Sequence, residues 1–280
     1  MQLILNGIAM GAIYALVAIG FVMVLRATNI LNLTQGDMAM VGAFSGLFFL
    51  QALHLNYFLA FILAIAFTAI VGLVFERLVI RPIKRPTLMF LVTATIAGSI
   101  LIKNVGLLVG GSEPLPFPPL FSQKAIYISG ISIAPHNLVV LGVTIIIMIL
   151  LQLFFYTSKW GIGMRAVMMQ RDVASLMGIN VSKSVALTFA ISAALGAAGG
   201  ILLAPLYFVS YDMGSITLKA FTAAALGGMY SLPGAIIGGL LIGLLENLIT
   251  GYVTSYYRDA IVFGILILVF VVKPDGIISD

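Results

Sequence analysis

Polar side chains that could do chemistry are concentrated in two places of this sequence. The first is the segment from Asn29 to Met40, where five amide, hydroxyl or carboxyl residues, including Asp37, occur within twelve positions. The second is Glu246, which is followed by Asn247 in an otherwise apolar stretch. A carboxylate in apolar surroundings is costly unless it is paired, protonated or hydrated. Both places are therefore candidates for lining a cavity or for holding the fold together.

Each carboxylate also has a structural interpretation. Asp37 lies at the start of an apolar run, where an acid can cap a helix and interact favourably with its dipole. Glu246 can hold a neighbouring helix through amides such as that of Asn247. The sequence leaves the structural and the cavity-lining interpretations open.

Motifs of common enzymes and metal sites are missing from the sequence. It contains no HExxH motif, no GxSxG motif, no cysteine, and two histidines, His54 and His136. The segment from Gly178 resembles the end of a phosphate-binding loop, but Ser182 stands where that loop needs a glycine before its lysine. We therefore expect no metal, no cofactor and no catalysis in this chain. If ATP drives its function, ATP and Mg²⁺ must bind to separate subunits.

The composition is that of an integral membrane protein. Of 280 residues, 62% are hydrophobic and 8% are charged, whereas soluble domains carry about 25% charged residues. The 38 charge-free residues from 38 to 75 are long enough to cross a bilayer twice. We predict an all-α integral membrane protein with about eight transmembrane helices, some of them broken, in a single domain over residues 1–280. The predicted spans are residues 1–25, 38–53, 57–75, 87–109, 137–156, 185–208, 220–250 and 259–273.

The predicted span over 220–250 is too long for one helix across a bilayer. It would measure about 46 Å at 1.5 Å per residue, and it contains glycine pairs and Pro233. We expect a break near residues 231–234. Broken helices at membrane depth tend to mark transport routes, although glycines four residues apart also let helices pack closely. The predicted translocation path consists of Asn32, Gln35, Gly36, Asp37, Gly228, Glu246 and Asn247.

Positive charges determine the predicted orientation. Segments around Arg77 and Arg171 are rich in Lys and Arg, and two spans separate them, so both can lie on the cytoplasmic side. Counting back three spans from Arg77 places the N-terminus outside, and the proline-rich loop from about 110 to 136 also falls outside. The net charge of +5 is explained by cytoplasmic loops beside a lipid bilayer. It does not indicate a nucleic-acid partner.

The predicted cytoplasmic segment from about 160 to 184 is too short and too charged to cross the membrane. Its run from Met164 to Met177 permits helix, and Gly178 is a helix stop. Such a helix can anchor at the membrane surface or dock in a groove of a partner protein. We predict that its cytoplasmic face carries Arg165, Arg171 and Asp172 and that the residues available for packing are Met168, Met169, Leu176 and Met177.

Seven segments in one order along the chain carry a family resemblance. They resemble the LivH-type permeases of branched-chain amino acid ABC importers, which reside in bacterial or archaeal plasma (inner) membranes. The segments are GIAMGAIYALVAIGF from Gly7, NLTQGDMAMVGA from Asn32, ERLVIRPIKRP from Glu76, RAVMMQRDVASLMGINVSKS from Arg165, FAISAALGAAGGILLAP from Phe189, KAFTAAALGGMYSLPGAIIGG from Lys219 and GLLENL from Gly243.

The resemblance implies an importer built from two permease subunits, two cytoplasmic ATPase subunits and an extracytoplasmic amino-acid-binding protein. This chain would be one permease, and a LivM-like subunit would be the other. Its cytoplasmic segment would be the coupling helix that enters a groove on the ATPase, with Arg165, Met168, Arg171, Asp172 and Gly178 as coupling residues. The family mainly transports Leu, Ile and Val, and related members handle other small amino acids and amides, including urea.

The main alternative from another class is a secondary transporter or channel for small polar solutes. Broken helices and an intramembrane Glu246 would suit it equally. The long cytoplasmic helix followed by Gly178 favours the ABC importer. A membrane-embedded enzyme has no catalytic constellation to support it.

Overall fold

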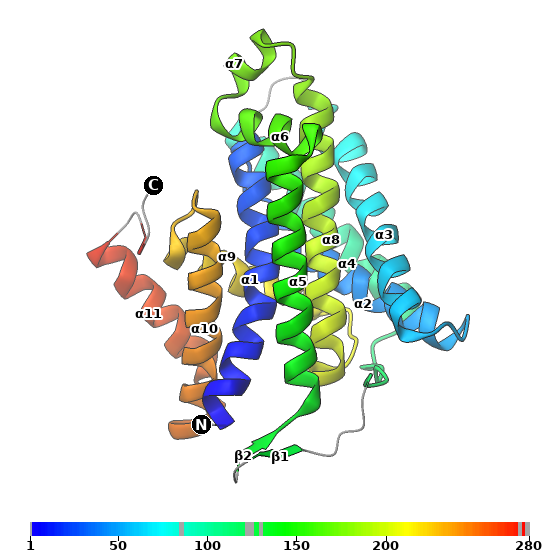
Figure 1. Cartoon of the computed structure of the whole chain (residues 1–280), viewed down its shortest axis with the longest axis vertical. Helices are drawn as coiled ribbons and strands as arrows, with labels where there is room; N and C mark the ends of the chain where they lie inside the picture. Colours follow the sequence, from blue (N-terminus) through cyan, green and yellow to red (C-terminus); the bar gives the residue numbers. More distant parts are fainter. Residues whose placement is uncertain (1, 84–86, 121–125, 129–130, 274–275, 278–280) are drawn as a thin grey trace.

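The chain forms a bundle of helices with one short β-hairpin (Figure 1). The computed structural model describes residues 2–83, 87–120, 126–128, 131–273 and 276–277. Within these residues, six helices are long and apolar enough to cross a membrane. They are α1 (Gln2–Thr28), α3 (Tyr57–Phe75) with the π-helical turn η1 (Glu76–Ile80) that continues it, α4 (Leu88–Gly110), α5 (Pro135–Thr157), α8 (Val181–Tyr207) and α10 (Leu232–Tyr252).

Two shorter helices correspond to the remaining predicted spans. Helix α2 (Gln35–Gln51) has 17 residues and α11 (Arg258–Val272) has 15, or about 26 and 22 Å at 1.5 Å per residue. The span predicted over 220–250 is divided into α9 (Ile216–Gly227) and α10. The prediction of a helical, multi-pass membrane protein with broken helices is confirmed.

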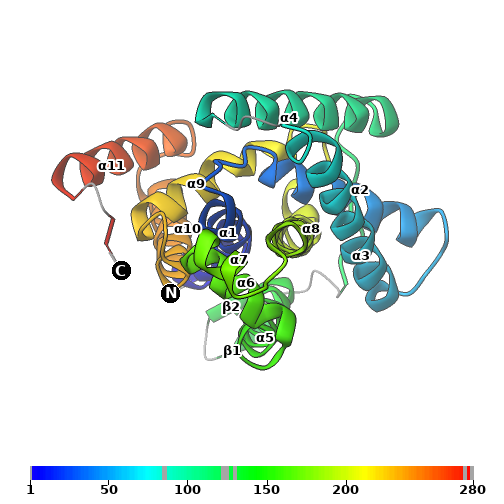
Figure 2. The same cartoon turned by 90° about the horizontal axis from the view of Figure 1, so that it is seen from above.

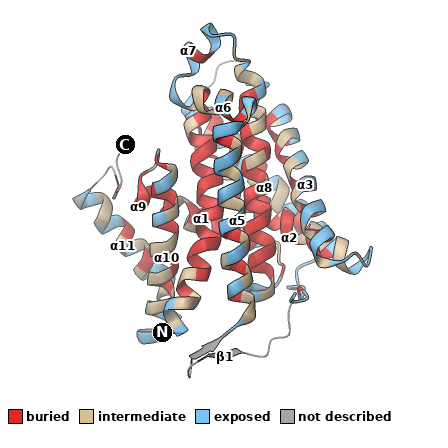
Figure 3. Ribbon diagram, viewed as in Figure 1, coloured by how far each residue is buried: buried red, intermediate tan, exposed pale blue. Residues whose placement is uncertain are grey.

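Helices α1 and α8 form the centre of the bundle. Both are buried along most of their length (Figure 3), because they are apolar all round and rich in small residues. Helices α3, α4 and α5 present most of their residues outward, and these residues are apolar, as on surfaces that face lipid. Seen from above, α9 and the start of α2 lie between α4 and the central α1 (Figure 2).

Glycines let α10 pack closely against α1 and α9. A Cβ atom on Gly11 of α1 would lie 2.7 Å from Leu240 Cα, and one on Gly243 would lie 2.2 Å from the Gly11 nitrogen. On another face of α10, a Cβ atom on Gly238 would lie 1.9 Å from Ala223 O of α9. The interpretation of these glycines as helix-packing positions is therefore confirmed.

The two ends of the bundle carry different connecting elements. Helices α6 (Lys159–Met169) and α7 (Arg171–Leu176) lie at one end (Figure 1). The N-terminus lies at the other end, beside the antiparallel hairpin of β1 (Ile126–Ile128) and β2 (Ile131–Ile133). This separation agrees with the predicted relative placement of the N-terminus, the 110–136 loop and the 160–184 segment.

Candidate functional site

Helix α2 begins inside the bundle rather than at its end. The buried Gln35 donates from Nε2 to Ser192 O of α8 at 3.0 Å, and its Oε1 accepts from Ser192 Oγ at 2.6 Å. The same hydroxyl lies 2.8 Å from Gly20 O of α1. Gly20 is eight residues, or about 12 Å, before the end of α1. The polar segment that follows α1 therefore descends into the bundle before α2 starts.

Asn32 shapes the turn that leads into α2. Its Oδ1 accepts from the Thr34 hydroxyl at 2.6 Å and from Thr34 N at 3.3 Å. Thr34, and not Asp37, occupies the N-cap position of α2. The interpretation of Asp37 as a helix cap is wrong, because the helix begins two residues earlier and Asp37 lies within its first turn.

Helices α2 and α9 meet at their first turns. The Gly36 N–H donates to Thr217 Oγ1 of α9 at 2.8 Å. A Cβ atom on Gly36 would lie 2.4 Å from Gly214 O, in the 3₁₀ turn η2 (Met213–Ser215) that precedes α9. Two helix N-termini, with their partial positive charges, thus converge inside the bundle. A leucine at Gly36 would force α2 and α9 apart, so loss of transport in that variant would report on folding.

Asp37 is buried with part of its carboxylate unsatisfied. The residue is 2% exposed, and its Oδ1 lies so close to Gly214 that a Cβ atom there would be 2.1 Å away. Its Oδ2 has no hydrogen-bond partner in the part of the chain that the structure describes. Since buried polar atoms are normally bonded, this oxygen is an exception among the described residues.

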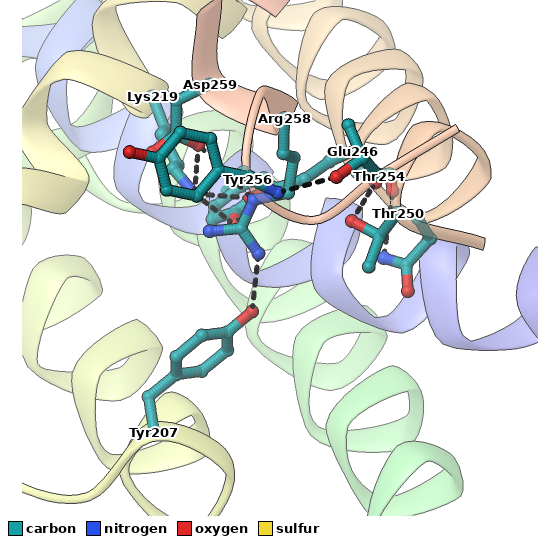
Figure 4. A network of polar contacts seen from close by, with 11 residues as sticks. Tyr207, Lys219, Glu246, Thr250, Thr254, Tyr256, Arg258 and Asp259 are labelled. Atoms are coloured by element: carbon teal, nitrogen blue, oxygen red, sulfur yellow. Dashed lines mark hydrogen bonds and ion pairs between the residues drawn. The ribbon is translucent and has the colours of Figure 1, made fainter. Parts of the chain in front are cut away.

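Glu246 lies at the centre of an ion-pair network (Figure 4). Tyr14 of α1 donates its hydroxyl to Glu246 Oε2 at 2.6 Å. Lys219 of α9 forms an ion pair with Oε1, and Arg258 Nε of α11 lies 3.0 Å from the same oxygen. The carboxylate therefore joins α10 to three other helices.

Asp259, at the outer edge of this network, supplies a second carboxylate for its two cations. Asp259 lies 3.5 Å from Lys219 Nζ and 3.3 Å from Arg258 Nε. Arg258 also donates to the Tyr207 hydroxyl of α8 at 3.4 Å. Two cations thus face two carboxylates, which compensates for the burial of Glu246.

Asn247 is not part of this network. It donates to Gly243 O of its own helix at 3.1 Å. The predicted structural role of Glu246 therefore uses other partners, and Tyr14, Lys219 and Arg258 were not predicted from the sequence. Lys219 and Arg258 could have been predicted as partners of Glu246 because they lie at the ends of the spans that precede and follow α10.

Gly228 lies away from the polar start of α2. It follows α9 with a φ of 120°, which favours glycine. A Cβ atom on Gly276 would lie 2.6 Å from Gly228 N, so these two glycines are in close contact. Thr217 and Gly228 are at opposite ends of α9, about 16 Å apart at 1.5 Å per residue. The break between α9 and α10 lies slightly before the predicted residues 231–234, and it does not adjoin Gly36 or Asp37.

The predicted coupling segment consists of two helices instead of one. They are separated at Gln170, whose φ of −151° and ψ of 102° are extended. Gly178, with a φ of 80°, follows the second helix as predicted. Because the break resets the helical phase, residues of α7 point in other directions than a continuous helix would give them.

Arg165 and Met168 face the bundle. The Arg165 guanidinium lies over the Tyr156 ring, 4.3 Å from its centroid, and Met168 packs against the main apolar core. Both line a cavity of about 660 Å³ together with Arg26 of α1. The Arg165 side chain therefore stacks on α5 instead of projecting freely from α6. The exposed members of the predicted coupling set are Arg171, Asp172 and Gly178.

Three apolar side chains form the outer tip of this segment. Met169 and Met177 are each 78% exposed, and Leu176 is 87% exposed. We call these three residues the apolar tip. They were predicted to be available for packing, and within the described chain they remain uncovered.

The sequence is similar to transport permeases over its whole length. It matches the family described as "Branched-chain amino acid transport system / permease component" over residues 3–270. The high-affinity branched-chain amino acid transport system permease protein LivH of Salmonella typhimurium is 35% identical to it, across 100% of this chain and 95% of that relative. LivH of Escherichia coli K12 is 34% identical and BraD of Pseudomonas aeruginosa 32% identical, with the same coverage.

A solved structure shares the fold. PsaBC from Streptococcus pneumoniae in complex with Fab superposes with a TM-score of 0.56 at 14% sequence identity. The match covers 98% of this chain and 93% of that one. At this identity the similarity concerns the arrangement of helices alone.

Proposed function

The chain belongs to the branched-chain amino acid transport permease family, and from this premise we propose that it forms a translocation path for branched-chain or related amino acids with a second, LivM-like permease. It is the non-catalytic transmembrane component of an ABC transport system. We further propose two ATPase subunits at the end of the bundle that carries α6 and α7, and an extracytoplasmic amino-acid-binding protein at the opposite end. ATP and Mg²⁺ would bind to the ATPase subunits.

The apolar tip is the observation that carries this proposal. Met169, Leu176 and Met177 project beyond the end of the bundle next to the charged Arg171 and Asp172. Exposed apolar side chains beside charged ones are typical of a protein interface. We propose that Arg171, Asp172 and Gly178 flank this contact, while Arg165 and Met168 join it to the membrane helices.

The start of α2 supports a path through the bundle. Non-helical backbone at membrane depth is tolerated where it is buried in protein or lines a cavity, and broken helices whose N-termini converge are found at transporter sites. We propose that Asn32, Gln35 and Gly36 hold this part of the path in shape and that Asp37 lines it. Glu246, Asn247 and Gly228 then support the helices around the path.

Transport should depend on ATP. Vesicles that contain this chain with its partner permease, ATPases and binding protein are expected to accumulate radiolabelled leucine only while ATP is supplied, because the proposed ATPase subunits drive transport. Dissipating the proton gradient should leave uptake unchanged, as measured by filter assay. Uptake that follows the proton gradient and ignores ATP would instead support a secondary transporter.

The N-terminus is proposed to lie outside, and the chain offers a clean test because it has no cysteine. Ser112 follows α4, Ser175 belongs to α7, and both are exposed. A Ser112→Cys variant should react with an impermeant maleimide in intact cells, whereas Ser175→Cys should react only in inverted vesicles stripped of ATPase. Ser122, in the same loop, lies outside the described residues. The opposite labelling pattern would overturn the proposed orientation.

A further inference from the structure

We propose that the pocket between α2, α4 and α9 binds the backbone of the transported amino acid, with Asp37 accepting hydrogen bonds from its ammonium group. The inference rests on the proposed function and adds a substrate site to it. The pocket has a volume of about 270 Å³ and is lined by residues of these three helices and of η2. It adjoins the point where α2 and α9 begin.

The unsatisfied oxygen of Asp37 is the first argument. Asp37 is 2% exposed and lines the pocket, while its Oδ2 lacks a hydrogen-bond partner in the described structure. A buried carboxylate oxygen without a partner is unfavourable, and a cation that supplies N–H donors removes this penalty. A side chain at position 214 would displace the Asp37 carboxylate, since a Cβ atom there would lie 2.1 Å from Asp37 Oδ1. Glycine at this position therefore keeps the carboxylate in place. The pocket is thus shaped around one buried carboxylate.

The second argument is that Lys103 can exchange its ion-pair partner for a substrate carboxylate. Lys103 of α4 and Asp212 both line the pocket and form an ion pair with each other. Their side chains are 42% and 63% exposed, so the pair contributes little stability and can separate at low cost. A zwitterion can replace it: the substrate carboxylate takes Lys103, and the substrate ammonium takes Asp37 and Asp212. The converging N-termini of α2 and α9 add positive potential for the carboxylate.

The apolar wall of the pocket is the third argument. Leu33, Ile96, Ile100 and Leu218 line the pocket together with the charged groups. These branched aliphatic side chains match the side chain of leucine, isoleucine or valine in polarity. They offer no hydrogen-bond partner to a side-chain amide. These four side chains therefore favour an apolar substrate side chain over a polar one.

The neighbouring pocket near the Glu246 network is a weaker candidate. It has a volume of about 300 Å³ and includes Lys219, Arg258 and Asp259. Those three side chains already bind one another or Glu246. A ligand there would have to break an ion-pair network that joins the helices, so we assign the substrate to the Asp37 pocket.

Leucine binding to the purified permease–ATPase complex, without the external binding protein, tests the assignment. Asp37→Asn should weaken binding of radiolabelled leucine by about tenfold or more, because a charge-assisted contact is lost. In wild type, leucine should compete far better than 4-methylpentanoate, which lacks the ammonium group. In the variant, the two competitors should become similar. Glu113→Gln, which removes an exposed carboxylate after α4, should leave all these values unchanged.

A second variant, Ile100→Trp, tests the pocket in case Asp37→Asn impairs folding. Ile100 is 58% exposed on α4, so Ile100→Trp can fill the pocket without disturbing the core. It should raise the leucine KM more than the valine KM in uptake assays. Normal leucine affinity in Asp37→Asn, or no leucine binding by the wild-type complex despite normal uptake with the binding protein, would overturn this assignment alone. A wild-type complex that transports no branched-chain amino acid would overturn the proposed function and this site with it.

Discussion

Replacing Glu246 with alanine is expected to lower the free energy of unfolding by about 3–5 kcal/mol, the usual effect of removing one partner from a buried ion pair. The change leaves the more exposed Asp259 as the remaining carboxylate beside Lys219 and Arg258, and it removes the acceptor of the Tyr14 hydroxyl. Repulsion between the cations would loosen α9 and α11 from α10. Thermal unfolding of the purified chain in detergent, followed by circular dichroism, would measure the loss.

Two further variants identify the cause. Asp259→Asn alters the outer carboxylate, whose side chain is 55% exposed, and it should cost no more than about 1 kcal/mol. Combining Glu246→Leu with Lys219→Met and Arg258→Leu removes the charges together and should recover most of the stability. If Glu246→Ala melts at the wild-type temperature, the network is not a structural clamp, and Glu246 must have another role.

The double variant Leu176→Glu with Met177→Glu is expected to reduce leucine uptake to background while the membrane helices stay folded. Both side chains are more than three-quarters exposed at the apolar tip, so the fold does not depend on them. Interface anchors of this kind contribute about 2 kcal/mol or more each. Losing two would weaken ATPase binding by about three orders of magnitude. Co-purification of the ATPase and transport in vesicles would measure both effects.

The matched control exchanges the same two residues. Leu176→Met with Met177→Leu preserves the apolar surface, so it should assemble with the ATPase and transport leucine normally. Arg165→Ala serves as a contrast, because Arg165 stacks on Tyr156 inside the chain and its loss should act on the position of α6. Wild-type ATPase binding by the double glutamate variant would show that the apolar tip is not the docking surface.

The sequence by itself determined features that depend on local composition. The spans followed from the length of charge-free runs, because each helix in lipid must satisfy its own backbone. The break between α9 and α10 followed from glycine pairs before a proline. Gly178 was recognised as a helix stop because few other residues adopt a positive φ there. Each of these inferences uses a short stretch of chain and needs no knowledge of its neighbours.

Only the tertiary structure decided which side chains meet. Tyr14 and Glu246 are 232 positions apart, and their contact depends on the antiparallel packing of α1 against α10 through glycines. The orientation of Arg165 depends on the packing of α6 against α5, where its guanidinium stacks on Tyr156, and the directions of the α7 residues depend on the break at Gln170. Gly36 and Gly228 were predicted to share the translocation path, but Gly36 contacts the first turn of α9 and Gly228 follows its last turn. The hydropathy of a segment indicates whether it is long and apolar enough to cross the membrane. The rotation of each helix about its axis and its depth relative to neighbouring helices are determined by packing. For this reason the sequence indicated the polar residues of the candidate path, and the fold alone determined which of them share a pocket.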